Sequence, residues 1–143
     1  MKTINVLLVD DEVPFVETMT KRLLKRDLTV SSAHSGAQAL DLLAGQSGID
    51  VIILDVKMPG MDGIETLKIV KARFPLIEVI MLTGHATVET GIDGMKQGAF
   101  DYLMKPCDMD QLVAKVKAAA DRKHGHETKI VEARLREITS RMA

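Results

Sequence analysis

Short aliphatic runs in this chain end in polar residues whose types could do chemistry together. They are Asp10 and Asp11, Asp55, Thr83 and Lys105. In an open parallel sheet, ligands bind beyond the carboxyl ends of the strands. If the runs are parallel strands, three carboxylates, one hydroxyl and one ammonium group from distant parts of the chain therefore meet at one edge.

Such a set suits magnesium-dependent phosphoryl transfer. Neighbouring carboxylates raise one another's pKa unless a cation lies among them, and an all-oxygen site favours Mg²⁺, which keeps positions open for phosphate oxygens. A lysine and a threonine donate to phosphoryl oxygens, and an aspartate can form a covalent aspartyl phosphate. Each residue alone has an ordinary structural explanation as a turn former, a helix cap or a solvated charge, so the combination carries the prediction.

The elements that must position these residues follow from periodicity. Strand-like runs occur at 4–9, 28–33, 51–54, 77–82 and 99–104, with amphipathic helical spacing between them. Three capping pairs predict helix starts: Ser35 with Gln38, Asp62 with Glu65, and Asp108 with Gln111. Repeated strand and helix units predict an α/β fold with a parallel sheet covered by helices on both faces.

The composition limits the classes of protein to which this chain can belong. The 143 residues fit about one domain, with 46% apolar and 27% charged residues. The net charge of −1 excludes binding to a nucleic-acid backbone by bulk charge, so we expect no direct nucleic-acid contact from this chain. Its aliphatic runs are far shorter than the ~18 residues of a membrane span. A single cysteine, Cys107, excludes an intramolecular disulfide, and we expect a cytoplasmic protein without membrane contact.

The segment between Thr83 and Gly98 is the weakest predicted helix. Gly91 and Gly94 lie inside it, and each costs about 1 kcal/mol of helix stability relative to alanine. Two interpretations stay open. The glycines either make this element easy to move, or they allow close packing.

Residues 122–143 differ from the rest of the chain. They hold six Lys or Arg against three Glu, a local net charge of +3, and the His-Gly-His segment at 124–126 predicts a helix stop. The residues that follow form an a/d seam of Val131, Leu135, Ile138 and Met142. A seam this short is compatible with a coiled-coil pairing helix, a tail docked on its own domain, or a frayed end. Two solvated histidines beside a glycine do not predict a metal site.

Four segments carry a resemblance to a known family. VLLVDDE at 6–12, VIILDVKMPGMDG at 51–63, MLTGHA at 81–86 and GAFDYLMKP at 98–106 resemble the signature segments of the receiver domain of two-component response regulators. The resemblance covers residues 4 to about 121. It implies a doubly wound five-stranded parallel sheet in the flavodoxin-like order 2-1-3-4-5, with a receiver domain at 1–121 and a helical C-terminal tail or linker at 122–143.

The resemblance also implies roles for individual residues. Asp55 accepts a phosphoryl group from a sensor histidine kinase or a phosphotransfer protein. Asp11 and Asp55 bind Mg²⁺ directly, together with the backbone carbonyl of Lys57, while Asp10 acts mainly through water. Lys105 pairs with the phosphoryl group. The chain is then no enzyme in the usual sense, because it catalyses only its own phosphorylation and dephosphorylation.

The implied switch runs from the phosphoryl group to a surface. The added charge draws Thr83 and Lys105 inward, and Tyr102 matches the switch aromatic that enters the space left by Thr83. The surface around the fourth and fifth helices then changes for a downstream protein or effector domain, or for a homodimer. Lys57 and His85, two positions after Asp55 and Thr83, are placed to tune the phosphoryl lifetime in either direction.

The family implies a few further features, and competing functions remain. Family members often have a cis peptide at the position of Lys105-Pro106. Cys107 stands where they commonly carry an aromatic or aliphatic residue, and its thiol is expected to pack rather than react. A magnesium-dependent aspartyl phosphatase of the haloacid dehalogenase type would use similar residue types, but its second acid stands two positions after the nucleophile, whereas Asp10 and Asp11 are adjacent. A non-phosphorylated interaction module would need none of the five polar residues.

Overall fold

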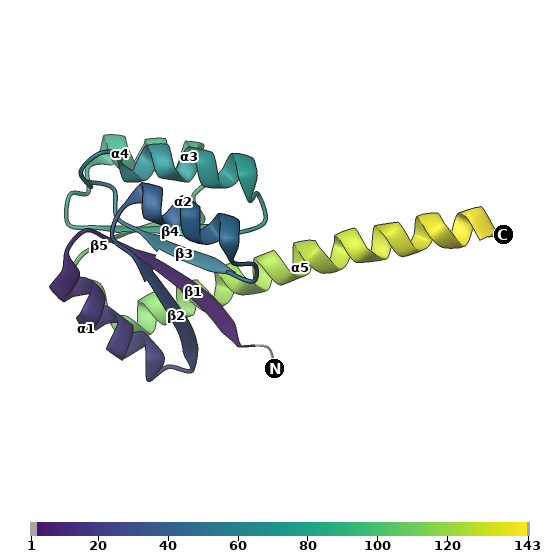
Figure 1. Ribbon diagram of the computed structural model, residues 1–143, viewed down its shortest axis with the longest axis horizontal. Coiled ribbons are helices and arrows are strands. Elements are labelled where there is room, and N and C mark those ends of the chain that lie inside the picture. The colour runs from purple at the N-terminus through teal and green to yellow at the C-terminus, as the bar shows by residue number, and fades with distance from the viewer. Residues whose placement is uncertain (1–2, 143) are drawn as a thin grey trace.

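The computed structural model describes residues 3–142 as one parallel sheet between two layers of helices, with one helix that runs far beyond them (Figure 1). The strands are β1 Ile4–Val9, β2 Leu28–Ala33, β3 Val51–Leu54, β4 Glu78–Thr83 and β5 Asp101–Met104. All neighbours are parallel, and their order is β2-β1-β3-β4-β5. The fold class and strand order expected from the sequence are confirmed.

The helices cover both faces of the sheet. They are α1 Val13–Leu24, α2 Gly36–Gly45, α3 Gly63–Arg73, α4 Val88–Lys96 and α5 Met109–Met142. Along β1, Val6 and Leu8 pack with α1 and α5, whereas Leu7 and Val9 pack with α2 and α3. Because successive side chains of a strand alternate between faces, strands buried on both sides are aliphatic throughout.

All three predicted caps form. The side chain of Ser35 accepts from the backbone N–H of Gln38 (3.1 Å), and Asp62 and Asp108 accept in the same way three residues ahead. A fourth cap was not predicted. Thr87 and Thr90 exchange side-chain and backbone hydrogen bonds as a capping box at the start of α4.

Two strand boundaries differ from the sequence prediction. Ile77 donates to the carbonyl of Phe74 in a turn, so β4 begins at Glu78 and ends at Thr83. Ala99 donates to the carbonyl of Gly94, which ties it to the end of α4, so β5 begins only at Asp101. Apolar residues stand in both turns directly before the strands, so residue type does not mark where the strands begin. The backbone hydrogen bonds do.

The glycines of α4 lie beside the ring of Tyr102. A Cβ on Gly94 would stand 3.4 Å from the ring, and a Cβ on Gly91 would stand 3.7 Å from it. Both are ordinary van der Waals distances, so the ring packs against this side of α4 without requiring glycine there. Both interpretations of these glycines therefore stay open.

The predicted helix stop at 124–126 is wrong. Helix α5 continues without interruption from Met109 to Met142, so its second half is neither frayed nor docked on the domain over the described residues. His124 is also not merely solvated, because its Nε2 lies 3.0 Å from a carboxylate oxygen of buried Asp50. Lys123, at 3.1 Å from the same oxygen, holds the helix at this point, and side-chain anchoring of this kind offsets the cost of Gly125.

The division expected between residues 1–121 and 122–143 stays a prediction, since it falls inside one helix. The outermost residues of those two segments, 1–2 and 143, lie outside the described residues. Within residues 3–142, none of the helices combines the length and the apolar character needed to cross a bilayer.

Candidate functional site

The three predicted acidic residues meet at the carboxyl edge of the sheet. Asp10 and Asp11 follow β1 and Asp55 follows β3, and one carboxylate oxygen from each lies within 4.8 Å of the others. Backbone hydrogen bonds continue the ladder past the strand ends, from Asp10 to Ala33 (3.1 Å) and from Asp55 to Val9 (3.0 Å). Asp10 and Asp55 are buried, while Asp11 is exposed at the rim.

Lys105 reaches the same cluster from the end of β5. Its Nζ lies 2.6 Å from Asp10, 3.3 Å from Glu12 and 4.0 Å from Asp55. The peptide bond between Lys105 and Pro106 is cis, as the resemblance implied. The nearest partner of the ammonium group in this state is thus Asp10 rather than Asp55.

The cluster holds more acidic groups than basic groups. Burial raises the pKa of Asp10, as does the nearby Asp55, and the hydrogen bond from Lys105 does not fully offset them. Burial alone would lower the pKa of Lys105, but its hydrogen bond to Asp10 and the surrounding acids raise it. The ammonium therefore stays charged, while the acids gain from any further cation.

Asp55 has an acceptor atom that the protein leaves unused. Its Oδ1 is buried and makes no hydrogen bond among the described residues, although buried carboxylate oxygens are nearly always paired. Asp55 lines an open hollow of about 510 Å³ together with Asp11, Glu12, Lys57, Met58, Pro59 and His85. A set of carboxylates with one orphaned oxygen beside open space fits a hard divalent cation that keeps water ligands.

A glycine behind Asp55 allows α3 to begin close to the site. A Cβ on Gly63 would stand 2.0 Å from the backbone oxygen of Asp55, and the N–H of Gly63 donates to Val56 at 2.7 Å. No larger residue fits there without moving the backbone that carries Asp55. This glycine belongs to the MPGMDG part of the segment at 51–63.

Of the remaining predicted residues, Thr83, Lys57 and His85 lie at the same edge, whereas Tyr102 lies within β5, three residues before Lys105. Thr83 is fully buried at the end of β4, where its hydroxyl accepts from the N–H of His85 at 3.0 Å. Lys57 and His85 are exposed on the rim of the hollow. The ring of Tyr102 packs beside α4, and its hydroxyl is 2.6 Å from the hydroxyl of Thr90.

Two contacts of Lys105 were missed by sequence reasoning. The ring of Phe15 lies under the ammonium group, with Nζ 3.9 Å from the ring centroid, and Glu12 adds a second acid partner. Glu12 lies in the turn after β1, and Phe15 lies in the first turn of α1. The segment that contains Asp10 and Asp11 therefore also contains two residues that contact Lys105. Cys107 packs against the α1 and α5 layer, and burial followed by the charge of Asp108 raises the pKa of its thiol, in keeping with a packing role.

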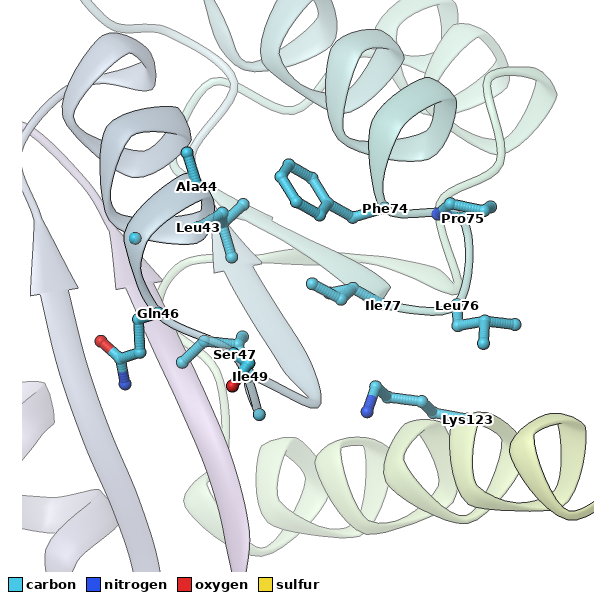
Figure 2. Close-up of a pocket in the computed structure, with 12 residues that line it drawn as sticks. Leu43, Ala44, Gln46, Ser47, Ile49, Phe74, Pro75, Leu76, Ile77 and Lys123 are labelled. Atoms are coloured by element: carbon cyan, nitrogen blue, oxygen red, sulfur yellow. The ribbon is translucent and has the colours of Figure 1, made fainter. Parts of the chain in front are cut away.

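A second hollow, of about 550 Å³, opens at the opposite edge of the sheet, between the ends of α2 and α3 and the side of α5 (Figure 2). Leu43, Ile49, Phe74 and Ile77 form its apolar lining. Lys123 is the only charged residue among those that line it, and its ammonium is paired with Asp50. The groups suited to phosphoryl chemistry are therefore at the other edge.

Comparisons with known proteins find similar sequences and similar structures. The family model described as the response regulator receiver domain matches residues 6–117. The chain is 40% identical over 114 residues to the DNA-binding transcriptional regulator NtrC of Escherichia coli, covering 80% of this chain and 24% of that protein. It is 40% identical over 121 residues to the transcriptional regulatory protein ZraR of Escherichia coli, covering 85% of this chain and 27% of that protein. This chain thus spans about a quarter of the length of these relatives.

Solved structures are similar as well. A response regulator receiver domain protein from Clostridium thermocellum superposes with a TM-score of 0.81 at 34% identity, covering 85% of this chain and 97% of that one. The similarity extends over nearly all of that domain.

Proposed function

This chain belongs to the response regulator receiver domain family, and from that premise we propose that Asp55 is its phosphoacceptor in a magnesium-dependent signalling switch. The observation that carries the proposal is the orphaned Oδ1 of Asp55 within a cluster of three acids and one lysine. The donor is a phosphohistidine on a sensor histidine kinase or a phosphotransfer protein. A cytoplasmic location, as expected from the sequence, fits these donors.

The acids of the cluster fit Mg²⁺. Asp11 and Asp55 would hold it directly, the backbone carbonyl of Lys57 would add a ligand, and Asp10 would act mainly through water. The ion, when bound, neutralises the acids and the phosphoryl oxygens so that an anionic carboxylate can approach an anionic donor. Asp10 is the nearest partner of Lys105, and its carboxylate would bind the ammonium less strongly with Mg²⁺ in the site.

In the transfer step, a carboxylate oxygen of Asp55 forms a bond to phosphorus while the bond from phosphorus to the donor imidazole nitrogen breaks. The electron pair of that bond stays with the imidazole, which leaves and takes up a proton from solvent. Lys105 needs to move by little to pair with a phosphoryl group on Asp55, since its Nζ is already 4.0 Å from Asp55 Oδ2. A charge-assisted hydrogen bond then holds the product.

The switch proposed from the resemblance involves Thr83 and Tyr102. The Thr83 hydroxyl would give up its bond from His85 and donate to the phosphoryl group. The Tyr102 ring, which lies against Gly91 and Gly94, would leave Thr90 and move inward, altering the surface of α4, β5 and α5. Phosphorylation shifts populations between two such states rather than creating one of them.

A mass measurement tests the acceptor. Incubation with a small-molecule phosphodonor and Mg²⁺ is expected to add one phosphoryl group, and Asp55→Asn is expected to abolish the gain in intact mass. Asp41→Asn, which removes an exposed aspartate of α2, is the matched control and keeps the gain. Labelling of the Asp55→Asn chain at the same rate would overturn the proposal.

Fluorescence tests the switch without confusion from other residues. The chain has no tryptophan and one tyrosine, so its tyrosine emission reports on Tyr102 alone. Beryllofluoride with Mg²⁺, a mimic of the phosphoryl group, is expected to change that emission in wild type and in Thr90→Val, but not in Thr83→Ala. An equal change in Thr83→Ala would show that Thr83 does not relay the signal.

The same site sets how long the signal lasts. Lys57 and His85 flank the hollow through which a hydrolytic water reaches Asp55, so substituting either is expected to change the dephosphorylation rate. Lys57→Ala and His85→Ala chains, labelled and then freed of donor, give these rates by loss of mass. Unchanged rates in both would remove them from the proposed tuning role.

The output of the switch passes to another protein or to an effector domain. NtrC and ZraR are transcriptional regulators in which the matched part is about a quarter of the length, so an effector domain elsewhere would contact nucleic acid. This chain itself is proposed to make protein contacts only.

A further inference from the structure

The backbone carbonyl of Asp10 lies where the pairing of β1 with β2 ends. The N–H of Asp10 donates to Ala33, the last residue of β2, at 3.1 Å, and so continues the ladder one residue past β1. In a parallel ladder, the next bond would run from a backbone N–H of the neighbouring strand to the carbonyl of Asp10. That strand ends at Ala33 and the chain enters α2 at Gly36, so the ladder stops at this point.

The side chain of His34 takes the place of the next backbone donor. Its Nδ1 lies 3.2 Å from the carbonyl oxygen of Asp10. A carbonyl oxygen can only accept, so Nδ1 carries the hydrogen of this bond. Because the peptide group is planar, a bond to the carbonyl of Asp10 also orients the N–H and the Cα of Asp11, from which its carboxylate extends.

His34 is attached to a segment that has little freedom to move. Its backbone N–H donates to the side chain of Gln38 at 2.8 Å, one turn into α2. The start of α2 is packed closely against α3, since a Cβ on Gly36 would overlap Oγ1 of Thr66. Thr66 is buried, and its hydroxyl donates to the carbonyl of Asp62 at 2.8 Å. The position of the imidazole is therefore set by two helices.

The two neighbouring acids depend on their shared peptide to different degrees. The carboxylate of Asp10 is buried, and it accepts from the N–H of Glu12 at 2.9 Å and from Lys105 at 2.6 Å. Asp11 is exposed at the rim, so its backbone rather than packing sets where its carboxylate lies. One oxygen of Asp11 nevertheless lies within 4.8 Å of oxygens of Asp10 and Asp55. A donor that orients the peptide before Asp11 thus orients the least buried of the three acids.

We propose that His34 is a positioning residue for the cation site. Its ring N–H, bound to the carbonyl of Asp10, holds Asp11 where the carboxylate can bind the same ion as Asp55. His34 is not one of the residues whose ligand atoms meet there, so it acts through the peptide of the two acids. The role rests on the proposed magnesium-dependent function. Groups that orient metal ligands commonly contribute about 10- to 100-fold to metal affinity.

Calorimetric titration of the whole chain with Mg²⁺ tests this role without phosphoryl chemistry. His34→Leu removes the ring N–H and is expected to weaken Mg²⁺ binding by about tenfold. His34→Asn is the matched variant, because Asn and Leu have nearly the same shape and Nδ2 of Asn is as many bonds from the backbone as Nδ1 of His. It is expected to keep the affinity of wild type. His126→Leu, at an exposed position of α5, controls for the loss of a histidine and also keeps the affinity.

The titrations distinguish a failure of this role from a failure of the proposed function. Equal Mg²⁺ affinity of wild type and His34→Leu would overturn the positioning role alone. Equal weakening in His34→Leu and His34→Asn would overturn it too, because the donor would then not be what matters. A wild type that binds no Mg²⁺ would overturn the proposed function and the role of His34 with it.

The Mg²⁺ requirement of labelling separates positioning from a general loss of stability. With a small-molecule phosphodonor, His34→Leu is expected to need about tenfold more Mg²⁺ for half of its maximal labelling rate, while that maximal rate stays as in wild type. A lower maximal rate with an unchanged Mg²⁺ requirement would contradict the positioning role. If His34→Leu does not fold, His34→Phe keeps a flat ring without the N–H and is expected to show the same shift.

Discussion

Buried aspartates stand at both edges of the sheet, and the protein treats them in opposite ways. Asp50, just before β3, is 4% exposed and accepts hydrogen bonds from the backbone of Asn5 (2.8 Å) and from Lys123 (3.1 Å), with His124 at 3.0 Å. Burial would raise the pKa of Asp50, but these bonds outweigh it and lower the pKa. Asp10, just after β1, is also buried, at 1% exposed, but in contrast to Asp50 its pKa is raised.

The difference separates an edge where the chain neutralises its buried acid from an edge whose acids are suited to a cation. At the amino edge, the chain itself neutralises Asp50. At the carboxyl edge, Lys105 contacts Asp10, Glu12 and Asp55, while Asp11 adds a further acid to the cluster. Asp55 Oδ1 makes no hydrogen bond within residues 3–142, so these acids would be stabilised by a further cation.

The largest expected effect comes from breaking the amino edge. Within residues 3–142, Asp50→Asn leaves the buried ammonium of Lys123 with the half-exposed Glu127 at 3.3 Å as its acidic partner, and we expect a loss of about 3 kcal/mol of unfolding free energy. Urea unfolding measures it. Asp110→Asn, which breaks the exposed pair with Arg26, is the control and costs less than about 1 kcal/mol. Equal losses would mean that the amino edge has no special role.

The pH dependence sharpens the same comparison. The folded pKa of Asp50 is lower than its unfolded value of 3.8, so its stabilisation is present above that value and lost as pH falls through the folded pKa. The stability gap between wild type and Asp50→Asn is therefore expected to be constant near neutral pH and to narrow below about pH 4. Asp10 acts in the opposite sense, because its raised pKa imposes a cost that protonation removes. A gap that widens on acidification would contradict this assignment.

A smaller effect of opposite sign is expected at the carboxyl edge. Asp11→Asn removes one of the clustered negative charges, so in buffer freed of Mg²⁺ the variant should be more stable than wild type by about 1 kcal/mol. With Mg²⁺ the wild type should gain more stability than the variant. A ligand stabilises the folded state more when it binds that state more tightly, and the variant has one acid fewer to bind the ion. Thermal melting with and without Mg²⁺ measures both. An equal or lower melting temperature of the variant without Mg²⁺ would count against the charge cluster.

The smallest effect concerns His124, the third group that contacts the carboxylate of Asp50. His124→Ala removes one polar contact while Asn5 and Lys123 remain, and we expect a loss of about 0.5–1 kcal/mol. His126→Ala, at an exposed position one residue beyond Gly125, is the control and should cost nothing. Paired urea titrations decide whether His124 contributes to the amino edge at all.

Much of the carboxyl edge was predictable because the chemistry there is local to strand ends. The acids after β1 and β3 and the lysine after β5 lie together as expected, since parallel strands bring their carboxyl ends to one edge. The three capping pairs were predictable for the same reason, because a cap depends on residues three positions apart.

The amino edge was not predictable from spacing. Asp50 meets Lys123 and His124 across more than seventy positions, and no motif links them. Without that contact, the His-Gly-His segment favours a helix stop, which is why the continuation of α5 was missed. Phe15 under Lys105 was missed likewise, since an aromatic residue at the start of a helix indicates only packing.

The sequence by itself determined the succession of strands and helices along the chain, the helix caps and the residue types available at the carboxyl edge. These features depend on periodicity and on near neighbours. Only the tertiary structure decided which charges are balanced and which are left over. Asp10 and Asp50 are residues of the same type, and their opposite pKa shifts arise from distant partners and burial that exist only after folding.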